Sequence, residues 1–179
     1  AIFAVAALGG LLGGEGNGAT TPTRASSIPP EAVKVLPGSD PYPPILVSGD
    51  WYDPVPMPSA VNTAGGEDSP FVLPDGRTMY FFFTPNVTVP AEKQLIDKVT
   101  GIYVSKMVNG SWSEATRVVL QDRGKVALDG CACVQGGMMW FCSAREGYSG
   151  VNIFTANASG SSWCCWSYAG DLLNIDYSI

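Results

Sequence analysis

The feature that most constrains the fold is an internal repeat in the second half of the chain. The stretch LPDGRTMYFFFT, residues 73–84, aligns with CVQGGMMWFCSA, residues 133–144, at an offset of 60. GIYVSKMVNGSW, residues 101–112, aligns with NIFTANASGSSW, residues 152–163, at an offset of 51. A longer connection in the first copy, residues 85–100, accounts for the difference, because lengthening a loop adds little closure entropy. Each structural element of the first copy is therefore expected to recur in the second.

Tight turns divide each copy into four strands. Asp75-Gly76 and Asn109-Gly110 tolerate positive φ between antiparallel strands, and Gly136 has the corresponding place in the second copy. The turns predict strands that end near residue 74, span 78–84 and 102–108, and begin at 112. We therefore assign one four-stranded unit to residues 61–120, a second to 121–171 and the start of a third to 172–179.

The stretch MYFFF, residues 79–83, distinguishes between the possible all-β folds. An ordinary antiparallel sheet has one solvated face, so its strands alternate between apolar and polar residues. Propeller blades stack face to face, which covers both sides of the inner strands, and their four-stranded units recur about every 40–50 residues. The predicted fold is therefore all-β: a β-propeller fragment of two four-stranded antiparallel blades plus the start of a third, after a Pro-rich N-terminal segment.

Two motifs of the first copy carry a family resemblance. EDSPFVLPDGRTMYF followed by GIYVSKMVNGSWSEATRV resembles the blades of the TolB-like, WD-like β-propeller repeat family, and the match covers about residues 61–178. The second copy departs from the pattern, since Gln135 replaces the turn Asp and Cys131 has the place of Phe71. SAREG resembles the family's Ser-x-Arg-Pro-Gly-Gly connection, which makes Arg145 and Glu146 candidates for ordering a loop or contacting a ligand. The resemblance implies an exported scaffold that binds protein or glycan, and it implies no particular reaction.

The first 60 residues differ in composition from the repeat. AIFAVAALGGLLGG predicts a signal peptide over residues 1–18, with an N-terminal membrane tether as the alternative. Residues 19–60 contain most of the 14 prolines, which disfavour helix and central strand. We predict a linker or an extended strap there, with disorder as the alternative. The strap is expected to lie against the folded body through Ile45, Leu46, Trp51 and Tyr52. The expected localisation is secreted, periplasmic or cell-surface.

Charge and the absence of histidine narrow the function. With 16 acidic and 10 basic residues and a net charge of −6, the chain lacks the positive charge that nucleic-acid binding requires. Without histidine, Ser-His-Asp and Cys-His catalysis and most zinc sites are excluded. A carboxylate pair of the glycosidase type remains, drawn from Glu67, Asp68, Asp75, Asp97, Glu114, Asp129, Glu146 and Asp171. Because most of these acids lie at predicted turns, we expect neither catalysis nor a cofactor, with a weak calcium site as the alternative.

The five cysteines all belong to the second copy. Their odd number leaves at least one thiol without a partner in the chain. In a regular hairpin Cys131 faces Phe141 and Cys142 lies on the opposite face, so a disulfide between these two cysteines would require an irregular hairpin. The adjacent Cys164 and Cys165 are expected to project to opposite sides of their strand.

The predicted function is that of a non-enzymatic exported scaffold that binds protein or surface polysaccharide through rim loops, including residues 85–100. Glycosylation motifs that fit export lie at Asn86, Asn109 and Asn157. The alternatives are a carboxylate-dependent glycan-active enzyme and a structural cell-surface component. We expect the remaining blades of a ring to come from further sequence or from self-association.

Overall fold

The structure, a computed structural model, describes residues 22–174. The predicted signal peptide or tether, residues 1–18, and residues 175–179 of the predicted third unit lie outside the described residues. The described helices are short: α1 Arg24–Ser27 and α2 Ala91–Gln94. Between residues 22 and 174, neither helix has the length and apolar character needed to cross a membrane.

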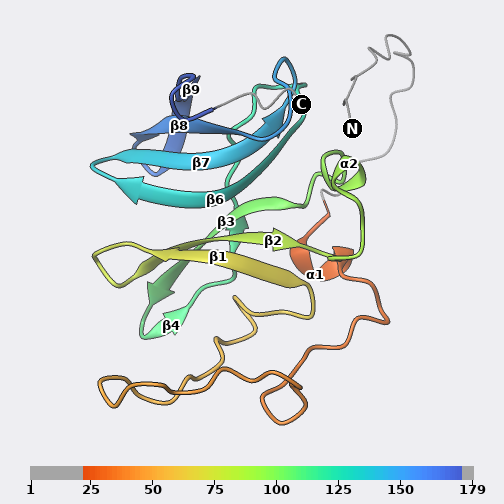
Figure 1. Cartoon of the computed structure of the whole chain (residues 1–179), viewed down its shortest axis with the longest axis vertical. Helices are drawn as coiled ribbons and strands as arrows, with labels where there is room; N and C mark the ends of the chain where they lie inside the picture. Colours follow the sequence, from red (N-terminus) through yellow and green to blue (C-terminus); the bar gives the residue numbers. More distant parts are fainter. Residues whose placement is uncertain (1–21, 175–179) are drawn as a thin grey trace.

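The strands form two antiparallel sheets, one from each copy of the repeat (Figure 1). Blade 1 contains β1 Gly66–Val72, β2 Thr78–Thr84, β3 Gly101–Val108, β4 Ser111–Trp112 and β5 Thr116–Arg117. Blade 2 contains β6 Ala127–Gln135, β7 Met138–Arg145, β8 Asn152–Ser159 and β9 Ser162–Tyr168. β1 to β4 pair in order, as do β6 to β9, and β5 pairs with β3. The short strands β4 and β5 therefore share the fourth position of blade 1. The predicted all-β fold with two four-stranded antiparallel blades is confirmed.

The second to fourth strands of the two blades match at the offsets read from the sequence. Phe81 pairs with Tyr103 in blade 1, and Phe141 pairs with Phe154 in blade 2. Tyr103 pairs with Arg117 across β3 and β5, as Phe154 pairs with Tyr168 across β8 and β9. The repeat is therefore structural as well as sequential.

The first strands of the two blades, β1 and β6, do not match at the offset read from the sequence, although each contains a β-bulge. The residue in the bulge of β1 is Ser69, with φ 49°, and its counterpart in β6 is Cys131, with φ 52°. The prediction that Cys131 takes the place of Phe71 is therefore wrong. The cause is turn length: Val72 pairs with Met79, whereas the equivalent pair of blade 2 lies closer together in sequence, which shifts the register before the turn.

Blade 2 covers one face of blade 1. In Figure 1 the two sheets lie one above the other, and β6 contacts β1, β2 and β3. Tyr80 and Ile102 of blade 1 share an apolar core with Phe141 and Phe154 of blade 2. The Tyr80 ring also meets the Trp163 ring edge-on, with centroids 6.1 Å apart. This contact between blades keeps one side of β2 out of water.

The opposite face of blade 1 is covered by the strap, which we define as residues 22–60. Met79, Phe81 and Phe83 form a second apolar core, against which Ile28 and Met57 of the strap pack. Both faces of residues 79–83 were expected to lie against neighbouring blades. In the described residues a blade covers one face and the strap covers the other, so the strap takes the place of a preceding blade.

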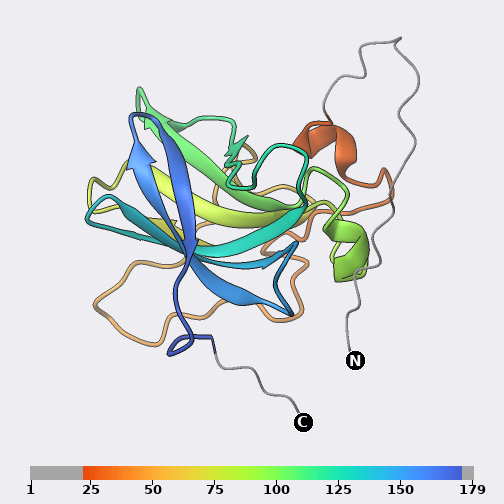
Figure 2. The ribbon, with the colours of Figure 1, turned by 90° about the horizontal axis from the view of Figure 1, so that it is seen from above.

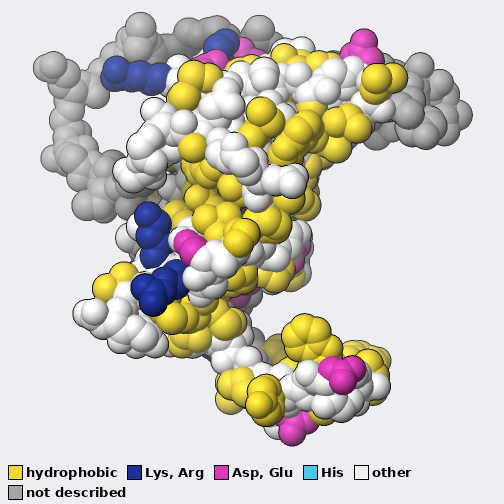
Figure 3. Space-filling model, turned by 90° about the vertical axis from the view of Figure 1, so that its left-hand side faces the viewer, with side chains coloured by type: hydrophobic (Ala, Val, Ile, Leu, Met, Phe, Trp, Pro, Cys, Tyr) yellow, Lys and Arg dark blue, Asp and Glu magenta, His cyan; other side chains and the backbone are white. Residues whose placement is uncertain are grey.

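The middle of the strap projects away from the blades, at the lower end of Figures 1 and 3. Ile45, Trp51 and Tyr52 are 77%, 75% and 98% exposed, and Leu46 is exposed as well, so the expectation that they pack on the folded body is wrong. Proline fixes φ and lacks a backbone N–H, which prevents this stretch from joining the sheet as an inner strand. The strap is held mainly at its two ends, near Ile28 and Met57.

Candidate functional site

The candidate site is a pocket between the strap and the long connection of blade 1. Helices α1 of the strap and α2 of the connection lie on the same side of the molecule, at the right in Figures 1 and 2. Between them is a pocket of about 330 Å³, which we call the rim pocket. Its lining residues are Pro22, Ser27, Pro29, Thr84, Pro85, Asn86, Val89, Lys93, Asp97 and Val99. Its volume lies at the lower end of the range of small-ligand sites.

The connection, residues 85–100, is ordered by its own side chains. The Asn86 side-chain oxygen accepts hydrogen bonds from the Thr88 backbone N–H at 2.9 Å and from the Thr88 hydroxyl at 2.7 Å. Asp97 accepts from the backbone N–H groups of Val99 and Thr100, both at 2.7 Å. Such Asx turns give a loop a defined shape without a sheet or a long helix. One wall of the rim pocket is therefore preformed.

The other wall depends on Arg24, which anchors the strap. Thr23 caps α1 by accepting from the Ser26 backbone N–H at 3.1 Å, and this short turn directs Arg24 inward. The Arg24 guanidinium donates to the carbonyls of Val61 at 3.0 Å and Ala60 at 2.9 Å, and Arg24 is only 4% exposed. It also donates to the Glu114 carboxylate at 3.2 Å. Arg24 thus connects the two ends of the strap.

Aromatic rings surround the same guanidinium. It lies 5.5 Å from the ring centroid of Phe81, 5.1 Å from that of Phe83 and 5.7 Å from that of Tyr103. Attraction between a cation and ring faces strengthens when both are withdrawn from water. Burial raises the pKa of Tyr103, whose hydroxyl donates to the Val99 carbonyl at 2.8 Å. The Tyr103 hydroxyl therefore remains neutral and links the cage to the connection.

Blade 2 contains an equivalent cage built around its own Arg145. This guanidinium lies 5.3 Å from the ring centroid of Phe141 and 4.9 Å from that of Phe154, the counterparts of Phe81 and Tyr103. Arg145 pairs with Asp129 at 2.7 Å, and Ser143 donates to the same carboxylate oxygen at 2.6 Å. In blade 1, Arg24 from the strap has the place that Arg145 has in blade 2. The strap therefore supplies a group that the first copy of the repeat lacks.

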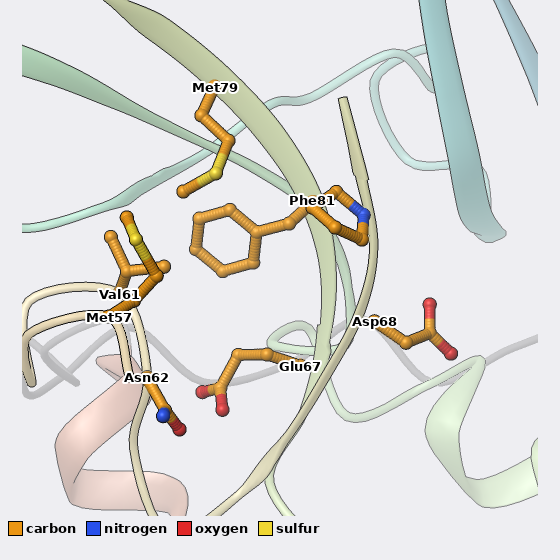
Figure 4. Close-up of a pocket in the computed structure, with 8 residues that line it drawn as sticks. Met57, Val61, Asn62, Glu67, Asp68, Met79 and Phe81 are labelled. Atoms are coloured by element: carbon orange, nitrogen blue, oxygen red, sulfur yellow. The ribbon is translucent and has the colours of Figure 1, made fainter. Parts of the chain in front are cut away.

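A second, smaller cavity of about 230 Å³ lies under the end of the strap (Figure 4). Met57, Met79 and Phe81 form its apolar side, and Glu67 points into it toward Asn62. Glu67 accepts from the Thr63 backbone N–H at 3.1 Å and lies 3.9 Å from Arg24. Asp68 points to the other side of β1 (Figure 4), so the adjacent carboxylates of Glu67 and Asp68 do not converge.

The predicted turn residues lie in hairpins away from the rim pocket. Asp75 accepts from the backbone N–H of Arg77 at 2.7 Å, which lowers the pKa of Asp75, and Gly76 follows with φ 64°. Asn109 and Gly110 have φ 51° and 80° in the turn between β3 and β4. Gly136, with φ 59°, lies in the turn between β6 and β7.

The other predicted site residues are divided between the rim and blade 2. Asn86 lines the rim pocket, whereas Asn109 and Asn157 are exposed on hairpins. Arg145 is 7% exposed and contacts protein groups, and Glu146 forms an exposed ion pair with Lys125 at 2.7 Å. Across residues 22–174, no three His, Cys, Asp or Glu side chains are grouped as metal ligands.

The connection was predicted from the sequence, but Arg24, which anchors the strap on the other side of the rim pocket, was not. Its only local signal is the pattern Thr23-x-x-Ser26, a capping box that indicates a helix start within a Pro-rich segment. Nothing in that pattern indicates that Arg24 contacts Val61, which lies 37 residues further along the chain.

Comparison with known proteins adds no relative. The chain matches no family model, no curated protein and no solved structure. The fold and the rim pocket therefore carry the functional argument.

Proposed function

We propose that the protein is a non-enzymatic, exported β-propeller scaffold of the TolB-like type that binds an extended protein segment in the rim pocket. The observation that carries this proposal is that the pocket lies between the strap, which has no counterpart in blade 2, and the connection, which is longer than its counterpart in blade 2. Rigid scaffolds commonly bind their partners through such added segments. Export is supported by the signal-like residues 1–18 and by the three glycosylation motifs.

The chemistry of the pocket favours a peptide over a sugar. Three prolines and two valines provide apolar surface, and Ser27, Lys93 and Asp97 provide a few polar groups. This combination of apolar walls and sparse polar groups is typical of ligand sites. No aromatic side chain is among the lining residues, so the pocket lacks a flat surface for stacking a sugar ring. We therefore expect apolar peptide side chains to bind, with an acidic group near Lys93.

The test is a selection of random linear peptides displayed on phage against the full chain. The affinity of each selected peptide is then compared between the unmodified chain and Lys93→Glu. Lys93 is chosen because it is exposed and forms no ion pair with a described residue. The matched control is Lys106→Glu, which makes the same charge change on β3, outside the pocket.

Peptides that lose at least tenfold in affinity for Lys93→Glu and bind Lys106→Glu normally would support the proposal. Tenfold corresponds to about 1.4 kcal/mol, within the range expected for a charge contact in a binding site. If no peptide is enriched above an unrelated β-protein, or if binding ignores Lys93→Glu, the rim pocket is not a peptide site.

Surface polysaccharide is a second candidate, favoured by a different observation. The strap exposes Tyr42, Trp51 and Tyr52 at 88%, 75% and 98%, and such rings provide flat apolar faces. If this surface binds glycans, retention on an immobilised polysaccharide panel should fall for Trp51→Ala and remain unchanged for Lys93→Glu. Retention that is equal for Trp51→Ala and the unmodified chain would exclude the strap as the glycan site.

A further inference from the structure

The five cysteines of blade 2 are all free thiols in the structure, and they are not evenly distributed. Cys131 and Cys133 lie on β6, Cys142 lies on β7, and Cys164 and Cys165 lie on β9. Four of these thiols lie at two backbone irregularities, one in β6 and one in β9. Neither pair belongs to the rim pocket or to the proposed binding function.

The first pair results from the bulge in β6. Gly130 pairs with Cys142, and the next residue, Cys131, lies inside the bulge with φ 52°. The Cys142 sulfur lies 3.5 Å from the point that a Cβ on Gly130 would occupy, which places it against the bulge. Burial, together with the neighbouring Cys131 thiol, raises the pKa of Cys142 to about 12. The hairpin thus has the irregularity that a contact between Cys131 and Cys142 requires.

The second pair results from a bulge in β9. Thr155 pairs with Ser167, but Asn157 pairs with Cys164, so β9 has one more residue than β8 over this stretch. Cys165 adopts φ 57°, and its sulfur lies 2.7 Å from the sulfur of Cys164. The expectation that adjacent cysteines project to opposite sides is therefore wrong, because it assumed a regular strand.

Cys133 is the remaining thiol. It is exposed and pairs across the strands with Trp140, and no hydrogen bond joins it to another described cysteine. The five cysteines thus divide into Cys164 and Cys165, whose sulfurs are in contact, Cys131 and Cys142, which lie at the same bulge, and the separate thiol of Cys133.

We infer that blade 2 is a double dithiol site, in which Cys131–Cys142 and Cys164–Cys165 each close to a disulfide while Cys133 remains a thiol. The oxidant is a small-molecule disulfide such as oxidised glutathione, which exchanges with each pair. In each exchange one thiolate attacks the small disulfide, forms a mixed disulfide and releases one thiol. The partner thiolate then attacks the mixed disulfide and releases the second thiol. Each pair thus loses two protons and two electrons, which the small disulfide takes up as two thiols.

Closure of the Cys164–Cys165 pair would fix the bulge that orients the next residue. Trp166 is the second residue of this bulge, and its ring centroid lies 4.4 Å from the Arg145 guanidinium. Its indole N–H donates to Asp122 at 3.2 Å. Oxidation is therefore expected to change the fluorescence of Trp166, whereas closure at Cys131 and Cys142 acts on the other edge of the sheet, between β6 and β7.

Trypsin makes the two pairs separately measurable. Cleavage after Lys125 and Arg145 places Cys131, Cys133 and Cys142 on one peptide and Cys164 with Cys165 on the next. The folded full chain is incubated with oxidised glutathione, its remaining thiols are blocked with a maleimide, and the peptides are weighed without reduction. The expected result is one internal disulfide in each peptide and a single maleimide adduct, on the first peptide.

The matched variant is Cys133→Ser, which should abolish the adduct and keep both disulfides. A disulfide that joins the two peptides, adducts on all five cysteines, or an adduct that persists in Cys133→Ser would each overturn the assignment. All three outcomes are read without reference to peptide binding, so the result is independent of the proposed function.

Discussion

Two ion pairs of equal length provide a quantitative test of the blade 2 core. Arg145 and Asp129 are 2.7 Å apart with side chains 3% and 1% exposed, whereas Lys125 and Glu146 are also 2.7 Å apart but 55% and 44% exposed. Distance alone predicts equal strength for the two pairs. Burial predicts a large difference, because a charge that loses its partner inside a protein is not rehydrated.

The perturbation is Asp129→Ala, compared with Glu146→Ala. Removing Asp129 leaves the Arg145 guanidinium buried among aromatic rings, and the expected loss is about 3–5 kcal/mol of unfolding free energy. The Ser143 hydroxyl also loses its acceptor, which lies at 2.6 Å. For Glu146→Ala we expect no resolvable change, since the Lys125 ammonium remains in water.

The assay is urea denaturation of the full chain followed by tryptophan fluorescence. Equal m-values would show that the variants differ in stability and not in denatured-state compactness. The double variant Asp129→Leu/Arg145→Met adds a check, because replacing both charges with apolar groups should recover much of the loss. A loss below about 1 kcal/mol for Asp129→Ala, or no recovery in the double variant, would refute the reasoning from burial.

Three further predictions concern blade 1. Arg24→Ala should lower the free energy of unfolding by about 3 kcal/mol and expose the strap to protease, because two carbonyls and a ring cage lose a buried cation. The exposed control Arg123→Ala should match the unmodified chain in both measurements. The free energy of unfolding should fall as pH rises above 10, because burial raises the pKa of Tyr103 in the folded state from 10.0 and the unfolded state loses this proton first. In a denaturation series across that pH range, Tyr103→Phe should show a smaller fall. Gly65→Ala should lower the unfolding free energy measured by thermal melting by about 1–3 kcal/mol, because its Cβ would lie 2.8 Å from the Thr84 carbonyl oxygen. The control Gly38→Ala, with open space around it, should leave the stability unchanged.

The blades were predictable because their signals are local. Gly76 and Gly110 mark turns by their own backbone freedom, and the apolar run from Met79 to Phe83 is readable without knowledge of any distant residue. Duplication strengthened the prediction, since two copies with the same order of strands and turns agree on one fold. The predicted strand order and antiparallel pairing were confirmed for both blades.

The bulges were not predictable at the same level. Alternation along β6 assigns Cys131 a face only if the strand is regular, and the inserted residue reverses that assignment. The same effect brings Cys164 and Cys165 together on β9. A bulge depends on how two strands align across a turn, and the sequence of either strand alone does not encode that alignment.

By itself, the sequence determined that this chain builds two stacked blades, because residue spacing, turn chemistry and repetition act over a few positions. Only the tertiary structure decided what covers the outer face of blade 1 and where the rim pocket lies. Those features depend on Arg24, whose partners Val61 and Glu114 lie 37 and 90 residues away. Contacts of that separation follow no periodic pattern, so they emerge only when the strap, the connection and the sheet are placed in space.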